Sequence, residues 1–176
     1  MKKIMIVLVG VLIGFATVSF AQTGFKFEKT DSVSKTKSQL YSDTKMFIAE
    51  TWKSAHNVIQ NDDKEAGMIL VKGLTSITCG RGLTIYTFTY SYNVKFLMKN
   101  SKYKIIAENI QYLHGPTPAW DGKQLNPQDE FPGMWKAGIG EKPYTELMTS
   151  LKTEMQSIVD SYQKNIKTQS LANSGW

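Results

Sequence analysis

The feature that most constrains the fold is LTIYTFTYSYNVKFLM, a 16-residue stretch from Leu83 to Met98. From Tyr86 to Phe96, every second side chain is aromatic or aliphatic, and the side chains between them carry hydroxyl, amide or amine groups. Strict alternation over this length predicts a strand of an antiparallel sheet with one covered face and one wet face. The rest of the chain must therefore supply pairing strands and apolar helix faces to cover the aromatic side.

The flanking sequence predicts the partner strands. GFKFEKTDS opens with a short strand pattern, and NVIQNDDKEAGMILVKGLTSIT predicts a short strand, a polar turn and a longer strand. Gly73 inside the longer strand predicts a bulge or bend, and the glycines of CGRG predict a tight hairpin turn. After the central stretch, KNSK predicts a turn and YKIIAENIQYLH predicts the returning strand.

Two segments have helical spacing of their apolar residues. One runs from Val33 to Trp52, with Ser32 or Ser34 as its N-cap, and the other follows Pro143, which sits in its first turn. The predicted order is β-α-β-β-β-β-α. It gives an α+β fold in which an antiparallel meander carries both helices on its aromatic face.

The first residues have the pattern of a signal peptide. Two lysines precede the apolar run Ile4–Phe20, and small residues precede a cleavage position after Ala21. We therefore expect residues 1–21 to be removed. The alternative is a retained membrane anchor, for which this run of 17 residues is at the short limit.

The mature chain is expected to be one soluble domain, residues 22–176, ending in a frayed tail at 169–176. Without the two lysines of the signal peptide, its formal charge falls from +6 to +4. This charge is too small to indicate a nucleic-acid-binding surface. The lone cysteine, Cys79, is predicted to be buried; the alternative is a disulfide that links two chains as a dimer.

Four stretches resemble a known family. They are the signal peptide ending in AQ, the helix start VSKTKSQLY, the hairpin SAHNVIQNDDKEAGMILVKG and the strand KYKIIAENIQY. They look like exported Bacteroidetes-type proteins of a domain family of unknown function with a TBP-like fold. The resemblance covers roughly residues 25–112. It implies a β-α-β(4)-α architecture and a periplasmic or secreted location in a Gram-negative bacterium. The family has no assigned activity, and a TBP-like fold does not by itself imply DNA binding.

No catalytic or metal-binding arrangement stands out. Cys79 could pair with His56 or His114 as nucleophile and base, but CGRG is already explained as a hairpin turn. The acidic runs NDDKE and DGKQLNPQDE lack the spacing of a calcium loop, and the former is typical of a solvated turn. We therefore expect no catalytic residues, no metal and no cofactor, and a protein that is not an enzyme.

The segment between the last strand and the last helix, residues 115–142, is long for such a connection. It holds four of the five prolines and four large apolar side chains that are candidates for binding a ligand or partner: Trp120, Phe131, Met134 and Trp135. Packing against the domain is the favoured interpretation, with a lid or an interaction loop as alternatives.

Two functions remain open from the sequence. The first is a non-catalytic binding or interaction module of the bacterial cell envelope with an unknown protein partner. The alternative is a carrier of a small apolar ligand held between sheet and helices under residues 115–140.

Overall fold

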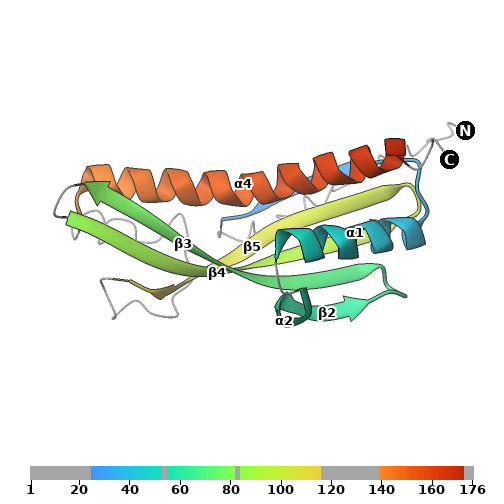
Figure 1. The fold of residues 1–176 in the computed structure, drawn as a ribbon, viewed down its shortest axis with the longest axis horizontal. Helices are drawn as coiled ribbons and strands as arrows, with labels where there is room; N and C mark the ends of the chain where they lie inside the picture. The colour runs from blue at the N-terminus through green and yellow to red at the C-terminus, as the bar shows by residue number, and fades with distance from the viewer. Residues whose placement is uncertain (1–24, 53–54, 82–83, 116–138, 173–176) are drawn as a thin grey trace, which may run out of the picture.

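The computed structural model describes residues 25–52, 55–81, 84–115 and 139–172, which form a two-layer α+β domain (Figure 1). A five-stranded antiparallel sheet has the order β1-β5-β4-β3-β2, and α1 and α4 cover one of its faces. The elements are β1 (Phe27–Ser32), α1 (Lys37–Thr51), α2 (Ala55–Val58), β2 (Ile59–Asp63), β3 (Met68–Arg81), β4 (Thr84–Lys99), β5 (Lys102–His114) and α4 (Glu141–Ala172). The predicted fold class and the predicted order of elements along the chain are confirmed, and the short helix α2 is an addition.

The meander β2-β3-β4-β5 follows the chain, whereas β1 joins the far edge by pairing with β5. Strands β3 and β4 keep one register along their whole length, from Met68 opposite Leu97 to Arg81 opposite Thr84. The predicted β3–β4 hairpin is therefore confirmed, but Cys79, Gly80 and Arg81 of CGRG belong to β3 and not to its turn. Helix α1 must carry the chain across the helix-covered face from one edge of the sheet to the other.

The sequence predicted a bulge or bend at Gly73. The bulge is wrong, because the β3–β4 register does not shift there. A Cβ atom on Gly73 would lie 2.3 Å from Cζ of Tyr92, its cross-strand partner. The glycine therefore makes room for the tyrosine ring. A register shift occurs instead between β4 and β5, where Asn109 has a φ of 56°.

The aromatic side of β4 forms the core, as the alternation predicted. Its inward side chains are buried from residue 88 to residue 98: Phe88, Tyr90, Tyr92, Val94, Phe96 and Met98. The ring of Tyr162 on α4 lies 4.8 Å from that of Phe96 and 5.2 Å from that of Phe47 on α1. These edge and tilted aromatic contacts join the sheet to both helices.

Helix α1 begins later than predicted, and the expected caps Ser32 and Ser34 are wrong. Thr36 is the N-cap and forms a capping box with Gln39. Residues 33–35 are held outside the helix by the β4–β5 turn: the N–H of Val33 donates to the carbonyl of Ser101, whose own N–H donates to the carbonyl of Lys35.

Helix α4 is longer than predicted. It begins at Glu141, inside the segment assigned to the long connection, and Pro143 lies in its first turn as expected. It continues to Ala172, through residues 169–172, whose sequence contains no proline or glycine to stop a helix. The frayed tail expected at 169–176 stays a prediction. In the described parts of the chain, no helix combines the length and apolar character needed to cross a membrane.

Candidate functional site

The four candidate residues of the long connection, Trp120, Phe131, Met134 and Trp135, lie outside the residues that the structure describes. The predictions of packing, lid or interaction loop for this segment therefore stay predictions.

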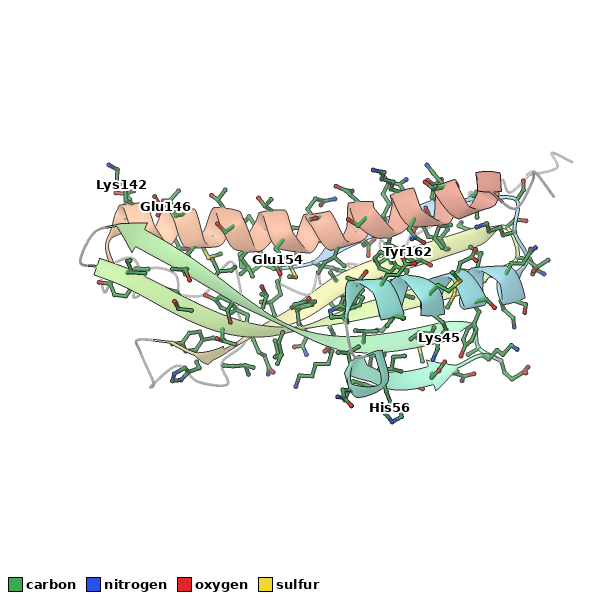
Figure 2. All side chains as sticks on the ribbon, in the orientation of Figure 1. Lys45, His56, Lys142, Glu146, Glu154 and Tyr162 are labelled. Carbon is green, nitrogen blue, oxygen red and sulfur yellow. The ribbon has the colours of Figure 1, made fainter. Side chains whose placement is uncertain are left out.

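The predicted burial of Cys79 is confirmed, because only 4% of the residue is exposed. Burial raises the pKa of its thiol, and the negative charge of Glu146 raises it further. Neither histidine is placed to act as its base: His56 lies on α2, at the other end of the molecule from Glu146, and His114 is exposed at the end of β5 (Figure 2). A thiol held in its neutral form is a poor nucleophile.

The acidic run NDDKE is only partly the predicted turn: Asn61–Asp63 belong to β2, and the turn begins at Lys64. The side chain of Asp63 accepts a hydrogen bond of 2.8 Å from the backbone N–H of Ala66. Asp62 forms an ion pair of 2.6 Å with Lys45 and accepts a hydrogen bond from the hydroxyl of Tyr41. Within the described residues, no three His, Cys, Asp or Glu side chains are grouped to hold a metal ion.

The layer between sheet and helices is filled by protein side chains where it is described. Phe88, Tyr90 and Tyr92 are at most 3% exposed, and the α4 residues Leu147 and Leu151 that cover the sheet are equally buried. The aromatic face therefore serves as core, as predicted. This packing gives no support to an apolar ligand between these elements.

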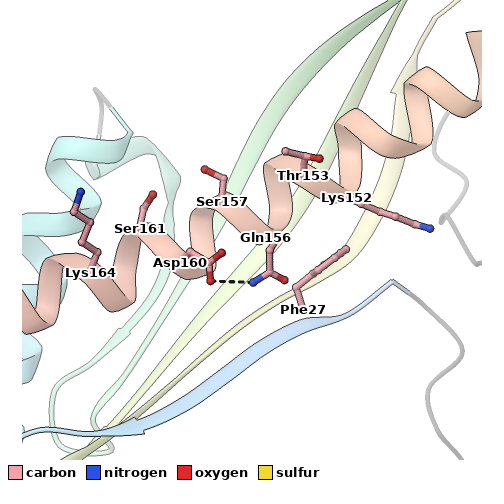
Figure 3. A pocket seen from close by; sticks show the side chains of 8 residues that line it. All are labelled: Phe27, Lys152, Thr153, Gln156, Ser157, Asp160, Ser161 and Lys164. Carbon is pink, nitrogen blue, oxygen red and sulfur yellow. Dashed lines mark hydrogen bonds between the residues drawn. The ribbon is translucent and has the colours of Figure 1, made fainter.

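A shallow groove follows the polar side of α4 beside β1 (Figure 3). Its volume is about 640 Å³, and its lining is one aromatic ring with helix side chains: Phe27, Lys152, Thr153, Gln156, Ser157, Asp160, Ser161 and Lys164. Gln156 donates a 3.0 Å hydrogen bond to Asp160 within it. Polar side chains are also what any solvent-facing helix side carries, so the groove alone identifies no ligand.

The opposite face of the sheet is free of the described helices. Hydroxyl pairs cross from β3 to β4 on this face, joining Ser76 to Thr89 and Thr78 to Thr87 at 3.1 Å. This is the hydroxyl-rich wet face that the alternation predicted. Leu74 also lies on it and is 64% exposed, although it belongs to the central part of a long strand.

One edge of β3 is open along most of its length. Strand β2 pairs with only the first four residues of β3, Met68–Val71, and in the described sheet the remaining ten, Lys72–Arg81, have β4 as their one partner. Near the end of this edge, the backbone N–H of Gly80 donates to the carboxylate of Glu146 at 3.2 Å. The two α4 residues Lys142 and Glu146 lie beside this tip of β3 (Figure 2).

Sequence reasoning missed this edge. It identified both strands, but the lengths over which β2 and β3 pair are set by a bulge between Ile59 and Asn61 and by the helix α2 before it. The exposed Leu74 was the available signal, because it occupies a position of the alternating pattern that faces water.

Comparisons with known proteins identify a family and a fold. Residues 27–113 match a family described as a domain of unknown function (DUF4468) with TBP-like fold. The crystal structure of a DUF4468 family protein from Bacteroides ovatus ATCC 8483 superposes with a TM-score of 0.56 at 15% identity, covering 80% of this chain and 86% of that one. A TBP-like protein from Parabacteroides distasonis ATCC 8503 has a TM-score of 0.49 at 10% identity, covering 79% and 94%. No curated protein matches the chain significantly. The resemblance inferred from the sequence is confirmed.

Proposed function

We propose that this chain, whose residues 27–113 belong to the DUF4468 family of domains of unknown function with TBP-like fold, is a non-catalytic interaction module of the bacterial cell envelope. In this proposal, it assembles with a second copy of itself along the open edge of β3. The observation that carries the proposal is the ten-residue stretch Lys72–Arg81, which has a strand on one side only within the described sheet.

An open strand edge offers unpaired backbone N–H and C=O groups, which another extended chain can pair with. Alternate residues of a strand direct these groups to the same side. Since the N–H of Gly80 points away from β4 to reach Glu146, those of Thr78, Ser76 and Leu74 point to the same open side. These three residues are the centre of the proposed interface.

The edge is complementary to itself in antiparallel pairing. When two copies pair about Ser76, Leu74 of each lies opposite Thr78 of the other, and Lys72 lies opposite Gly80. No like charges meet in this register, and charges of one sign placed opposite each other would weaken it. The exposed Leu74 side chain would gain apolar contact with the threonine methyl group.

Natural edges are commonly protected by charged side chains, prolines or coverage. Along this edge, among the described residues, Glu146 accepts a hydrogen bond from an edge N–H, that of Gly80. Between the charged ends Lys72 and Arg81, the sequence of the edge contains neither charge nor proline. The middle of the edge therefore lacks the usual sequence devices that prevent pairing.

Sedimentation velocity of the mature protein, from low micromolar to submillimolar concentration, tests the proposal. We expect a concentration-dependent monomer–dimer equilibrium. Ser76→Pro removes the edge N–H, and we expect it to abolish dimer formation. Ser76→Ala is the matched control, because it also loses the hydroxyl contact with Thr89 but keeps the N–H, and it should dimerise like the parent.

Two results would overturn the proposal. The first is a parent protein that stays monomeric over the whole concentration range. The second is a folded Ser76→Pro variant that dimerises as well as Ser76→Ala. Circular dichroism of both variants establishes that each is folded before the comparison is made.

Placement in the cell envelope rests on the amino-terminal pattern. The two lysines, the apolar run Ile4–Phe20 and Ala21 support export followed by cleavage before Gln22. The burial of the lone Cys79 is compatible with an oxidising compartment, because a shielded thiol is protected from reaction there.

A further inference from the structure

A second feature lies at the other end of the sheet, around the β4–β5 turn. A pocket of about 360 Å³ is lined by residues of three neighbouring strands, β1, β5 and β4, and the β2–β3 turn: Thr30, Ala66, Gly67, Leu97, Met98, Lys99, Lys102, Tyr103 and Lys104. Its volume falls within the range of small-molecule sites. Three of the nine lining residues are lysines, which is a high density for so small a surface.

Strand geometry places the three ammonium groups on one face. Lys99 and Lys102 are direct cross-strand partners, so their side chains leave the same side of the sheet. Lys104 lies two residues further along β5 and therefore faces the same way. Like charges placed directly opposite destabilise a strand pair unless another charge compensates them.

The protein supplies little compensation. Lys104 forms an ion pair of 3.1 Å with Glu28, but Glu28 also pairs with Lys26 at 2.8 Å. For Lys99 and Lys102, the described residues provide no ion pair. The nearby amide side chain of Asn100 is engaged elsewhere, because it accepts from the backbone N–H of Lys37. After one carboxylate is set against three lysines, the pocket retains about two positive charges.

From this geometry we propose that the pocket binds a phosphate group in the form of a phosphomonoester. A phosphomonoester carries a charge of about −1.5 to −2 at neutral pH and has three acceptor oxygens, which match the residual charge and the number of lysines. Lysine binds phosphate as a point charge without a fixed fork geometry, which suits three flexible side chains. Thr30 adds a hydroxyl group and Leu97 an apolar surface for the esterified group.

The test is a titration of the mature protein followed by amide chemical shifts. The probes are inorganic phosphate and glycerol 3-phosphate, with sodium chloride at matched ionic strength as the reference. We expect saturable shifts at Thr30, Gly67 and Lys102. Affinity should fall as the pH is lowered through about 6, where the phosphomonoester dianion gains a proton and becomes a monoanion.

Lys99→Gln combined with Lys102→Gln removes both lysines that lack an ion pair. We expect this variant to bind either probe at least about tenfold more weakly, as expected for the loss of charge-assisted hydrogen bonds. The matched control is Lys142→Gln, which changes charge on α4 at the opposite end of the molecule (Figure 2) and should bind within about twofold of the parent.

Vesicles distinguish the two sources of such a group. We would compare sedimentation with vesicles of phosphatidylcholine alone and of phosphatidylcholine with phosphatidic acid, whose headgroup is a phosphomonoester. Lysine-dependent binding to the latter identifies a lipid ligand, whereas binding of glycerol 3-phosphate without vesicle binding identifies a soluble one. Absence of saturable shifts with both soluble probes, or equal weakening in the Lys142→Gln control, would overturn the proposal. These readouts are independent of dimerisation.

Discussion

At the scale of single residues, the most consequential contact is a buried ion pair. Lys35 is 6% and Asp43 8% exposed, and their charged atoms lie 2.6 Å apart. The ammonium group of Lys35 also donates to the carbonyl of Ile166 at 3.0 Å. One side chain thus ties the segment before α1 to both helices. Such a pair adds little net stability compared with apolar residues in the same place. Removing one partner, however, leaves the other charge buried without compensation and destabilises the folded state.

Replacing Asp43 by alanine should therefore be strongly destabilising. The variant leaves the Lys35 ammonium group buried without its carboxylate, and we expect a loss of about 3–5 kcal/mol in the free energy of unfolding. Urea denaturation measures it. Adding Lys35→Met should recover most of the loss. The control is Lys45→Gln, which breaks the exposed pair with Asp62 and should cost about 1 kcal/mol or less.

A second residue-scale prediction concerns acid stability. Asp31 on β1 accepts hydrogen bonds from Lys167 and Gln163 of α4, which together with the backbone N–H of Ser32 lower its pKa from 3.8 to about 2. A carboxylate with a lowered pKa in the folded state stabilises that state above about pH 4, and this stabilisation is lost as the pH falls toward 2.

Asp31→Asn should accordingly lower the urea midpoint at neutral pH, and its difference from the parent should shrink between about pH 4 and pH 2. High salt should reduce the difference as well, since the Lys167 side chain is 52% exposed and is screened by ions. A difference that stays constant across this pH range would contradict the assignment.

At the scale of elements, β3 and β4 form one long ribbon whose register is continuous because Gly73 leaves space for its partner. A Cβ atom there would meet three atoms of the Tyr92 ring between 2.3 and 2.6 Å. Tyr92 is itself 3% exposed, and its hydroxyl oxygen accepts a hydrogen bond from the indole N–H of Trp52. It therefore has little freedom to move aside.

Gly73→Ala should destabilise the fold by about 1–3 kcal/mol through overpacking, measured as a shift in the thermal midpoint and in urea. Ser76→Ala, on the same strand but facing water, is the comparison and should change stability by about 0.5 kcal/mol or less. Equal stability of the two variants would show that the Tyr92 ring accommodates the methyl group.

At the scale of the whole molecule, the two proposed binding features occupy different ends of the sheet. The lysine pocket is formed at the β4–β5 turn, and the open edge is formed toward the β3–β4 turn. This separation allows one site to be altered without the other.

Expression of the full sequence in a Gram-negative host should yield a periplasmic product that begins at Gln22. Intact mass spectrometry of the periplasmic fraction measures this directly. Ala21→Arg places a large charged residue at the cleavage position and should leave the precursor uncleaved. A product in the cytoplasmic fraction that retains residues 1–21 would contradict export.

Much of the architecture follows from the sequence by itself. The period-two alternation of β4 determines that one face is covered and one is wet, and the apolar stripes of residues 37–51 and 141–166 determine that helices do the covering. These are local periodicities, so they can be recognised in the sequence without knowledge of the tertiary contacts. The helix boundaries are harder to predict from the sequence. The cap at Thr36 depends on contacts with a turn more than sixty residues away, where the N–H of Val33 donates to the carbonyl of Ser101.

Only the tertiary structure decides which polar groups come together and which edge stays open. Lys35 meets Asp43 and Ile166 because α1 crosses the sheet and α4 returns beside it. Lys99, Lys102 and Lys104 converge with Thr30 because β1 pairs with β5 at the far edge. The physical reason is that register and layer packing, which join residues distant in the chain, are set by the summed burial of the core and by no single stretch of sequence.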